Sequence, residues 1–231
     1  MLRLTCHICF GFCWLLFART ISAQPQEVRF EFLTIEHGLS NFSINDIIQD
    51  GQGFLWFATE DGLNKYDGYD FKIYKADPDD GAALPHSYVI QLYLDRSNSL
   101  WVIAGSRLCR YEPSIDGFQR FDDLFPKTKP MADKNVAAVC EDRYGNFWIG
   151  TDRGLFRYNP QQDTLDVYHP DAAGNGALSS EVVRALYEDR SGTIWIGTVV
   201  GLERFDRGRN TFISYRLDAP GKGVTGIRED G

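Results

Sequence analysis

The side chains that could carry chemistry are scattered along this chain and form no compact motif. Beyond the first two dozen residues there are three histidines, His37, His86 and His169, each in a separate polar turn region. The sequence has no phosphate-binding loop, zinc-protease or nucleophile-elbow signature, so those three chemistries have no support. Carboxylates are abundant, but no pair stands out as the acid and base that sugar hydrolysis requires. The residue types favour binding over catalysis.

Acidic turns are the other feature that could hold a ligand. Asp50, Asp95, Asp142 and Asp189 each open a polar turn, and turns rich in oxygen ligands can bind Ca²⁺. However, each turn supplies few further carboxylates. The acidic segment at residues 77–81 has the composition of a solvated loop. We therefore expect no metal and no cofactor.

An internal repeat positions these turns. A tryptophan follows the aspartate by six residues each time, at Trp56, Trp101, Trp148 and Trp195, with spacings of 45, 47 and 47 residues. An aromatic residue follows each tryptophan by ten residues. A period of this length indicates a repeat architecture, in which each copy is one supersecondary unit.

Each copy reads as four short strands, so the predicted fold is an all-β propeller built of four-stranded blades. In the fourth copy, strands are expected over residues 182–187, 193–198, 201–205 and 211–215. The turn between the first two strands requires a positive φ, which glycine or asparagine supplies. The tryptophan is expected to wedge between neighbouring blades and to bury roughly 150–250 Å². This structural role is favoured over carbohydrate stacking.

The second copy departs from the pattern of the others. Ile103 stands where the other copies have alanine or glycine, and Arg107 replaces a glycine. Loops on one face of a propeller gather around the central channel, and we expect a ligand there. The predicted ligand-binding residues are His86, Tyr88 and Arg107, with ordinary solvent-facing loop residues as the alternative. Other side chains expected on that face are Asn41, Glu60, Asp61, Asp152 and Arg153.

The N-terminal residues have the pattern of a secretory signal peptide. Arg3 precedes an apolar run at residues 8–18, and a small-residue exit predicts cleavage after Ala23. The domains are therefore expected at 1–23 and 24–231, and an uncleaved membrane anchor is the less favoured alternative because the run is short. Only Cys109 and Cys140 remain beyond the signal, too few for a disulfide framework. The net charge of −8 offers no basic patch for nucleic acid.

The segments at residues 36–40, 61–66 and 188–198 resemble the two-component regulator propeller repeats. This resemblance implies the periplasmic sensor region of a Bacteroides-type hybrid histidine kinase, on the periplasmic side of the inner membrane. An oligosaccharide ligand, a phosphorelay kinase elsewhere in the receptor and a homodimer of the full-length protein are implied with it. The alternatives are an exported polysaccharide lyase or hydrolase and a noncatalytic protein-interaction scaffold.

The two ends of the repeat array suggest an incomplete ring. Residues 224–231 match residues 183–190 and would begin another blade, while residues 30–35 look like an outermost strand. The expected architecture is a truncated propeller of four blades plus the first strand of a fifth. Further blades and the kinase would belong to the rest of a larger receptor.

Overall fold

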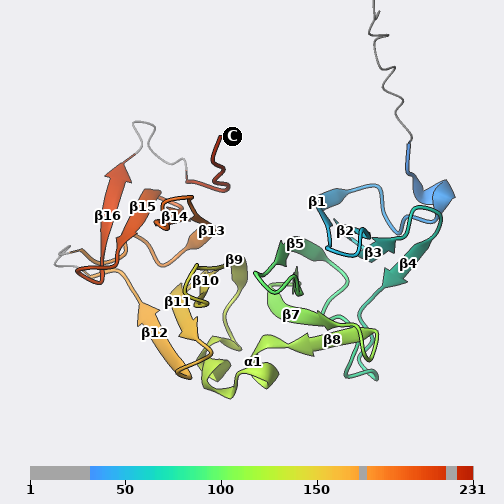
Figure 1. Ribbon diagram of the computed structural model, residues 1–231, viewed down its shortest axis with the longest axis horizontal. Helices are drawn as coiled ribbons and strands as arrows, with labels where there is room; N and C mark the ends of the chain where they lie inside the picture. Colours follow the sequence, from blue (N-terminus) through green and yellow to red (C-terminus); the bar gives the residue numbers. More distant parts are fainter. Residues whose placement is uncertain (1–31, 172–175, 217–222, 231) are drawn as a thin grey trace, which may run out of the picture. The chain divides into compact units, whose positions relative to one another are not determined.

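The computed structural model describes residues 32–171, 176–216 and 223–230 (Figure 1). Contacts separate Met1–Phe32 from a second unit, Leu33–Gly231, which contains all of the assigned helices and strands. The predicted signal peptide and its cleavage point at Ala23 lie outside the described residues.

Four antiparallel sheets of four strands follow one another along the second unit, which confirms the prediction of propeller blades (Figure 1). Strands within each sheet pair in chain order, and the first strands β1, β5, β9 and β13 contact one another from blade to blade. Blade one is β1 (Ile44–Gln49), β2 (Leu55–Thr59), β3 (Gly62–Tyr66) and β4 (Phe71–Tyr74); blade two is β5 (Val89–Leu94), β6 (Leu100–Ala104), β7 (Arg107–Glu112) and β8 (Gly117–Arg120); blade three is β9 (Val136–Glu141), β10 (Phe147–Thr151), β11 (Gly154–Asn159) and β12 (Thr164–Tyr168); blade four is β13 (Val183–Glu188), β14 (Ile194–Thr198), β15 (Gly201–Asp206) and β16 (Thr211–Arg216). The four strands predicted for the fourth copy are each found within one residue of their expected bounds.

Three short helices accompany the sheets: η1 (Ile35–His37), α1 (Phe121–Leu124) and η2 (Pro126–Met131). None of the helices in the described part of the chain is long and apolar enough to cross a membrane. The strand expected at residues 30–35 is not found in the described residues: residues 32–34 form no strand, and η1 begins at Ile35. Residues 30 and 31 lie outside the described residues. The Thr34 side chain accepts a hydrogen bond from Glu36 N, and Gly38 ends the helix at a φ of 102°. These caps stabilise a helical turn in place of a strand.

The first strand of a fifth blade does not form as a strand in the described residues 223–230. The segment nevertheless takes the corresponding place beside blade four. Arg190 N donates to Glu229 Oε2 at 3.1 Å, as Arg96 N donates to Glu141 Oε2 at 2.8 Å between blades two and three. A strand is defined by its ladder to a neighbour, and no described strand pairs with this segment.

The repeated aspartate and tryptophan form one local structure in every blade. Each indole Nε1 donates to the aspartate six residues earlier, at 2.8, 2.9, 2.9 and 2.8 Å for Trp56, Trp101, Trp148 and Trp195. The other carboxylate oxygen accepts backbone N–H groups of the turn. Positive φ angles occur, as predicted, at the fourth turn residue: Gly53 (94°), Asn98 (61°), Gly145 (77°) and Gly192 (88°). These carboxylates thus hold the turn and the indole together.

Three of the four tryptophans fill the boundaries between blades, as expected. Trp56, Trp101 and Trp148 are 1%, 2% and 0% exposed. Each ring lies edge-on to an aromatic ring of the next blade, with centroid separations of 4.8 Å from Trp56 to Tyr111 and 4.8 Å from Trp148 to Phe205. Aromatic contacts of this kind add to the free energy gained by burial. Trp195 is half-buried and contacts Tyr215 of its own blade.

The links between consecutive blades are of two kinds. Parallel bridges join Ala76 to Leu84 and Pro170 to Leu178, in the links that follow blades one and three. The link between blades two and three instead contains α1 and η2, and it buries Met131 where the other links bury a leucine. The regular repeat is therefore interrupted at one place, next to the irregular second blade.

Candidate functional site

The hairpin between the second and third strands of blade two differs from its counterparts. In blades one, three and four a threonine hydroxyl donates to the carbonyl of the glycine three residues later, as Thr59 does to Gly62 at 2.8 Å. Blade two has Ala104 in place of the threonine, and its two central turn residues, Gly105 and Ser106, have φ angles of 54° and 69°. Because the positive φ angles lie in the centre of this turn, the position after it can be Arg107.

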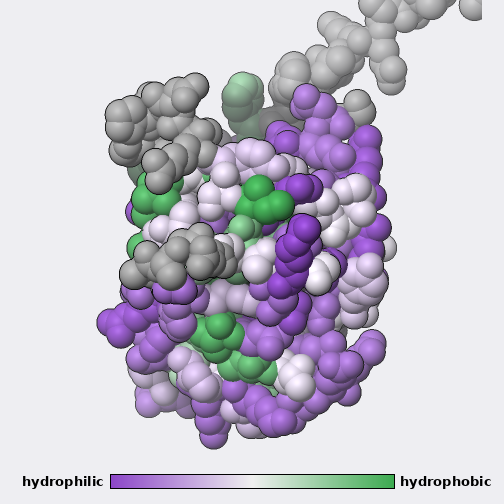
Figure 2. All heavy atoms as spheres, turned by 90° about the vertical axis from the view of Figure 1, so that its left-hand side faces the viewer, coloured by the Kyte–Doolittle hydropathy of each residue, from purple (hydrophilic) through white to green (hydrophobic). Residues whose placement is uncertain are grey.

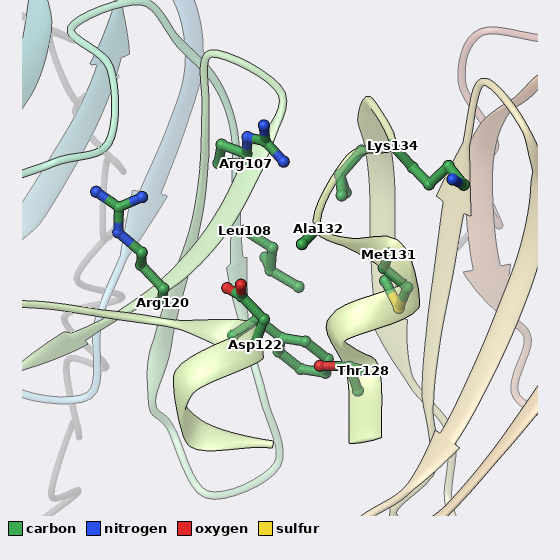
Figure 3. A pocket seen from close by; sticks show the side chains of 10 residues that line it. Arg107, Leu108, Arg120, Asp122, Thr128, Met131, Ala132 and Lys134 are labelled. Atoms are coloured by element: carbon green, nitrogen blue, oxygen red, sulfur yellow. The ribbon is translucent and has the colours of Figure 1, made fainter. Parts of the chain in front are cut away.

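A cavity of about 180 Å³ lies between this hairpin and the helical link to blade three. Leu108 from β7 and Met131 from η2 give it an apolar floor, and both are buried (Figure 3). Thr128, also fully buried, donates its hydroxyl to Phe125 O at 2.6 Å and so holds the link in place. The complete lining is Arg107, Leu108, Arg120, Phe121, Asp122, Thr128, Met131, Ala132, Lys134 and Val136.

Two arginines and one acid surround the cavity. Arg107 begins β7, Arg120 ends β8 and Asp122 lies in α1 (Figure 3). Within the described part of the chain, neither guanidinium forms an ion pair or donates a hydrogen bond. Lys134 bonds instead to Asp133, and its ammonium group points away from the other labelled side chains. The cavity therefore offers two available cations above an apolar floor.

The other two predicted site residues lie at the hairpin and not at this cavity. His86 packs against Gly105, where an added Cβ would come within 2.3 Å of the His86 Cβ. Its Nδ1 accepts a hydrogen bond from Tyr88 N at 2.9 Å, and Tyr88 O accepts one from Gly105 N at 2.8 Å. Tyr88 exposes 39% of its surface. Of the three residues predicted together, only Arg107 lines the cavity.

A second and larger cavity, of about 580 Å³, lies among the first strands of the blades. Asn45, Gln91 and Arg184 are among its polar lining residues. Asp152, which was expected on the channel face, also lines it and accepts two hydrogen bonds from Asn135, at 3.0 and 2.8 Å. This is the central channel, and its polar wall can accommodate water or a polar ligand.

The remaining residues expected on the channel face are engaged in local contacts. Asp61 pairs with Lys75 at 2.6 Å. Asn41 Oδ1 accepts from Ser43 N at 2.7 Å, which closes a turn, and Glu60 N donates to Ser43 O at 3.3 Å. Arg153 N donates to the Thr151 hydroxyl at 3.0 Å. The side chains of Asn41 and Asp61 thus have a structural role, whereas Glu60 and Arg153 are held through their backbone.

The two cysteine thiols of the described residues are buried and protonated. Burial raises the pKa of the Cys109 thiol to about 12, and it also raises the pKa of Cys140. Both thiols are free and buried, so they remain protonated and unreactive. No group of three or more His, Cys, Asp or Glu side chains in the described part of the chain is placed to hold a metal. The chemistry that the arrangement does support is the binding of an anionic group at Arg107 and Arg120.

The surface on the blade-four side is mainly hydrophilic, with small separate hydrophobic spots (Figure 2). The described residues visible on this face form no broad apolar patch of the kind that marks a large protein interface. The cavity beside α1 is therefore a stronger candidate for recognition than the face in Figure 2.

Arg120 and Asp122 were not predicted from the sequence. Asp122 lies in the link that interrupts the repeat, and Arg120 ends β8 at a position where the other copies have the uncharged residues Ile73, Val167 and Ser214. The available signal was the interruption itself, because residues 121–135 lack the short turn pattern found between other strands.

Comparisons with known proteins agree with the repeat structure. The family described as two component regulator propeller matches residues 37–61, 130–153 and 177–199. These matches cover parts of blades one, three and four and omit the irregular blade two. Histidine kinase P4 of Formosa agariphila is 45% identical over 67 residues, which are 29% of this chain and 5% of the kinase.

Solved structures with the same fold include two extracellular domains from B. thetaiotaomicron. That of a hybrid two component system is 25% identical with a TM-score of 0.54, covering 80% of this chain and 32% of the domain. That of a one component system is 19% identical with a TM-score of 0.52, covering 85% and 32%. The virginiamycin B lyase of Staphylococcus aureus, 12% identical with a TM-score of 0.57, covers 78% and 58% and shares the fold alone. The chain spans about a third of each extracellular domain.

Proposed function

Because this chain carries two-component regulator propeller repeats, we propose that it is the ligand-sensing module of an exported two-component receptor. The module faces the periplasm and has no catalytic activity of its own. The full-length receptor contains the kinase that receives the signal, contains the remaining blades and forms the homodimer. The similarity to the extracellular domain of a hybrid two component system supports this assignment.

The cavity beside the interrupted link is the observation that carries the proposal. Arg107 and Arg120 place two cations next to an apolar floor, in the one blade that departs from the repeat. Arginine binds carboxylate and sulfate-like groups through a planar fork of donors, and the CH faces of a sugar pack on apolar side chains. The ligand is therefore an oligosaccharide that presents an acidic group to these arginines.

Signalling follows from a shift between conformations of the receptor. The ligand stabilises the conformation in which the link and the blade-two hairpin enclose it, and the difference in affinity sets how far the population moves. α1 and η2 join blades two and three, so closure around a ligand bears on the relative position of two blades. No covalent step takes place in the module.

The test is calorimetric titration of this chain with a panel of acidic and neutral oligosaccharides. We expect a member of the acidic group to bind, and Arg107→Ala and Arg120→Ala each to weaken that binding by about tenfold or more, as expected for a lost charged hydrogen bond. Arg153→Ala is the matched control, because Arg153 is exposed on the equivalent hairpin of blade three and does not line the cavity.

Three results would change the assignment. Binding that is equally weakened by Arg153→Ala, or untouched by the other two variants, would move the site elsewhere. Loss of binding in His86→Ala and Tyr88→Ala would place the ligand at the hairpin instead. Cleavage of a panel member during the titration would favour an exported polysaccharide lyase or hydrolase, and binding of protein partners alone would favour a scaffold.

A further inference from the structure

The boundary between blades three and four, called junction 3–4, shows an arginine of this chain bound in an inter-blade pocket. Arg207, in the turn after β15, donates to Asp142 Oδ2 at 2.9 Å. Asp142 is fully buried and also holds the Trp148 indole. The guanidinium lies over the Tyr144 ring, 4.7 Å from its centroid. Junction 3–4 thus shows how the repeated aspartate can bind a guanidinium group.

The boundary between blades one and two, called junction 1–2, has the same framework without the arginine. Asp50 and Trp56 occupy the positions of Asp142 and Trp148, with the same indole to carboxylate bond at 2.8 Å. Pro113 stands in the four-residue turn where Arg207 stands, and both turns have a positive φ at their last residue, Asp116 and Asn210.

A cavity of about 290 Å³ takes the place of that arginine in junction 1–2. Asp50, Trp56 and Pro113 all line it, and so does Gln52, the counterpart of Tyr144. This volume is at the lower end of the range for ligand pockets, and it accommodates a single side chain. Asp50 has no ion-pair partner within the described part of the chain.

The ammonium group of Lys65 already lies at this cavity, and it leaves room for a second cation. Lys65 lies over Phe54, with its Nζ 3.9 Å from the ring centroid. It corresponds to Arg157, which lies 5.5 Å from the Trp148 ring while Arg207 binds at the same junction. A cation at this position therefore coexists with a bound guanidinium in junction 3–4.

We propose that junction 1–2 is a binding site for a guanidinium group, carried by an arginine side chain of a protein partner. The carboxylate of Asp50 accepts the guanidinium as Asp142 accepts Arg207. The site is separate from the cavity at Arg107, and it does not depend on the sensing function proposed above. Gln52 replaces the Tyr144 ring here, so the preference for a guanidinium over an ammonium group rests on its planar fork of donors toward the Asp50 carboxylate.

The experiment titrates this chain with N-acetylarginine methylamide and, for comparison, N-acetyllysine methylamide. The readout is the indole N–H resonance of Trp56 in an NMR spectrum, because that proton is donated to Asp50. We expect the arginine probe to shift this resonance and to leave that of Trp195 in place, and the lysine probe to bind about tenfold more weakly.

The decisive variant is Pro113→Arg, which supplies the arginine from the chain itself. It should reduce the affinity for the arginine probe by about tenfold or more, while Pro113→Ala leaves the affinity unchanged. Arg207→Ala is the positive control, because it should open a second site whose occupation shifts the Trp148 resonance. The proposal is overturned if the two probes bind alike, if the Trp56 resonance does not move, or if folded Pro113→Arg binds as well as wild type.

Discussion

Junctions 1–2 and 3–4 are built on the same aspartate and tryptophan, yet they are held together differently. Junction 3–4 contains two arginines, Arg143 and Arg207, that cross between the blades. Junction 1–2 has Gly51 and Pro113 at those positions and contains a cavity. One repeat can thus produce a boundary crossed by two arginines and a boundary that contains a cavity.

The two junctions also differ in which blade supplies the larger side chain and which the glycine that it packs against. Arg143 lies against Gly192, where an added Cβ would come within 2.4 Å of its guanidinium carbon. At junction 1–2 the large and small residues are reversed, since Asn98 leans against Gly51. Each boundary has one side chain crossing to a glycine, a charged one in Arg143 and an uncharged one in Asn98. The charge that crosses junction 1–2 is instead that of Lys72, which pairs with Asp116.

The largest change in the free energy of unfolding is expected from removal of Arg207, which has no counterpart in junction 1–2. Arg207→Ala leaves the buried Asp142 carboxylate without its cation and should lower the free energy of unfolding by about 3 kcal/mol. Pro113→Ala should cost less than about 1 kcal/mol, mainly through the entropy of the unfolded chain. Chemical denaturation of both variants measures the two values. Equal losses would show that the junctions are not held differently.

The second arginine of junction 3–4 should contribute less. Arg143 donates to Glu188 at 3.2 Å and to two backbone carbonyls, and its side chain is about a third exposed. Arg143→Ala should therefore cost about 1–2 kcal/mol. Arg190→Ala is the control, because Arg190 has the same place in blade four and its guanidinium lies 3.8 Å from Glu229. A loss of more than about 0.5 kcal/mol in that exposed control would contradict the ranking.

Acid should weaken junction 3–4 through Asp142. Burial acts to raise the pKa of this carboxyl, but hydrogen bonds from Trp148, Asn146 and Arg207 together hold it below the ordinary value. A carboxylate with a lowered folded pKa stabilises the fold above its unfolded pKa, roughly 3.9, and this stabilisation is lost as the pH falls through the folded pKa. Melting temperatures should fall more steeply below about pH 4 in wild type than in Arg207→Ala. Parallel curves would contradict the assignment.

The smallest effect concerns a buried contact that differs between blades one and four. Glu203 accepts hydrogen bonds from Ser179, whereas at the equivalent place in blade one Asn64 accepts from Ser40 N and donates to Ser40 Oγ. Burial raises the pKa of Glu203 despite the bonds from Ser179. A carboxyl with a raised folded pKa loses its contribution to stability as the pH rises through that pKa.

Glu203→Gln tests this difference because the amide can reproduce the Asn64 contact. The variant should gain stability relative to wild type as the pH rises above about 4.3, by no more than about 1 kcal/mol at pH 7. Denaturation curves at pH 4 and pH 7 measure the change. A relative stability that is the same at both values would show that Glu203 ionises without a penalty.

The features that sequence reasoning predicted are those that recur within a blade. Trp56 and Asp50 are six residues apart, so their contact is a local consequence of the repeat and could be anticipated in all four copies. Arg107 could be singled out because it broke the repeat. Arg120 and Arg207 could not, since their neighbours come from another blade or from a link without a counterpart. His86 and Tyr88 as ligand contacts remain predictions.

The indole to aspartate bond has a consequence for the order in which the chain folds. It closes a loop of only six residues, so little chain entropy is lost when it forms. Each hairpin can therefore assemble before the next blade has formed. We expect blades to fold one after another from the N-terminus, each presenting an ordered tryptophan as the template on which its successor docks.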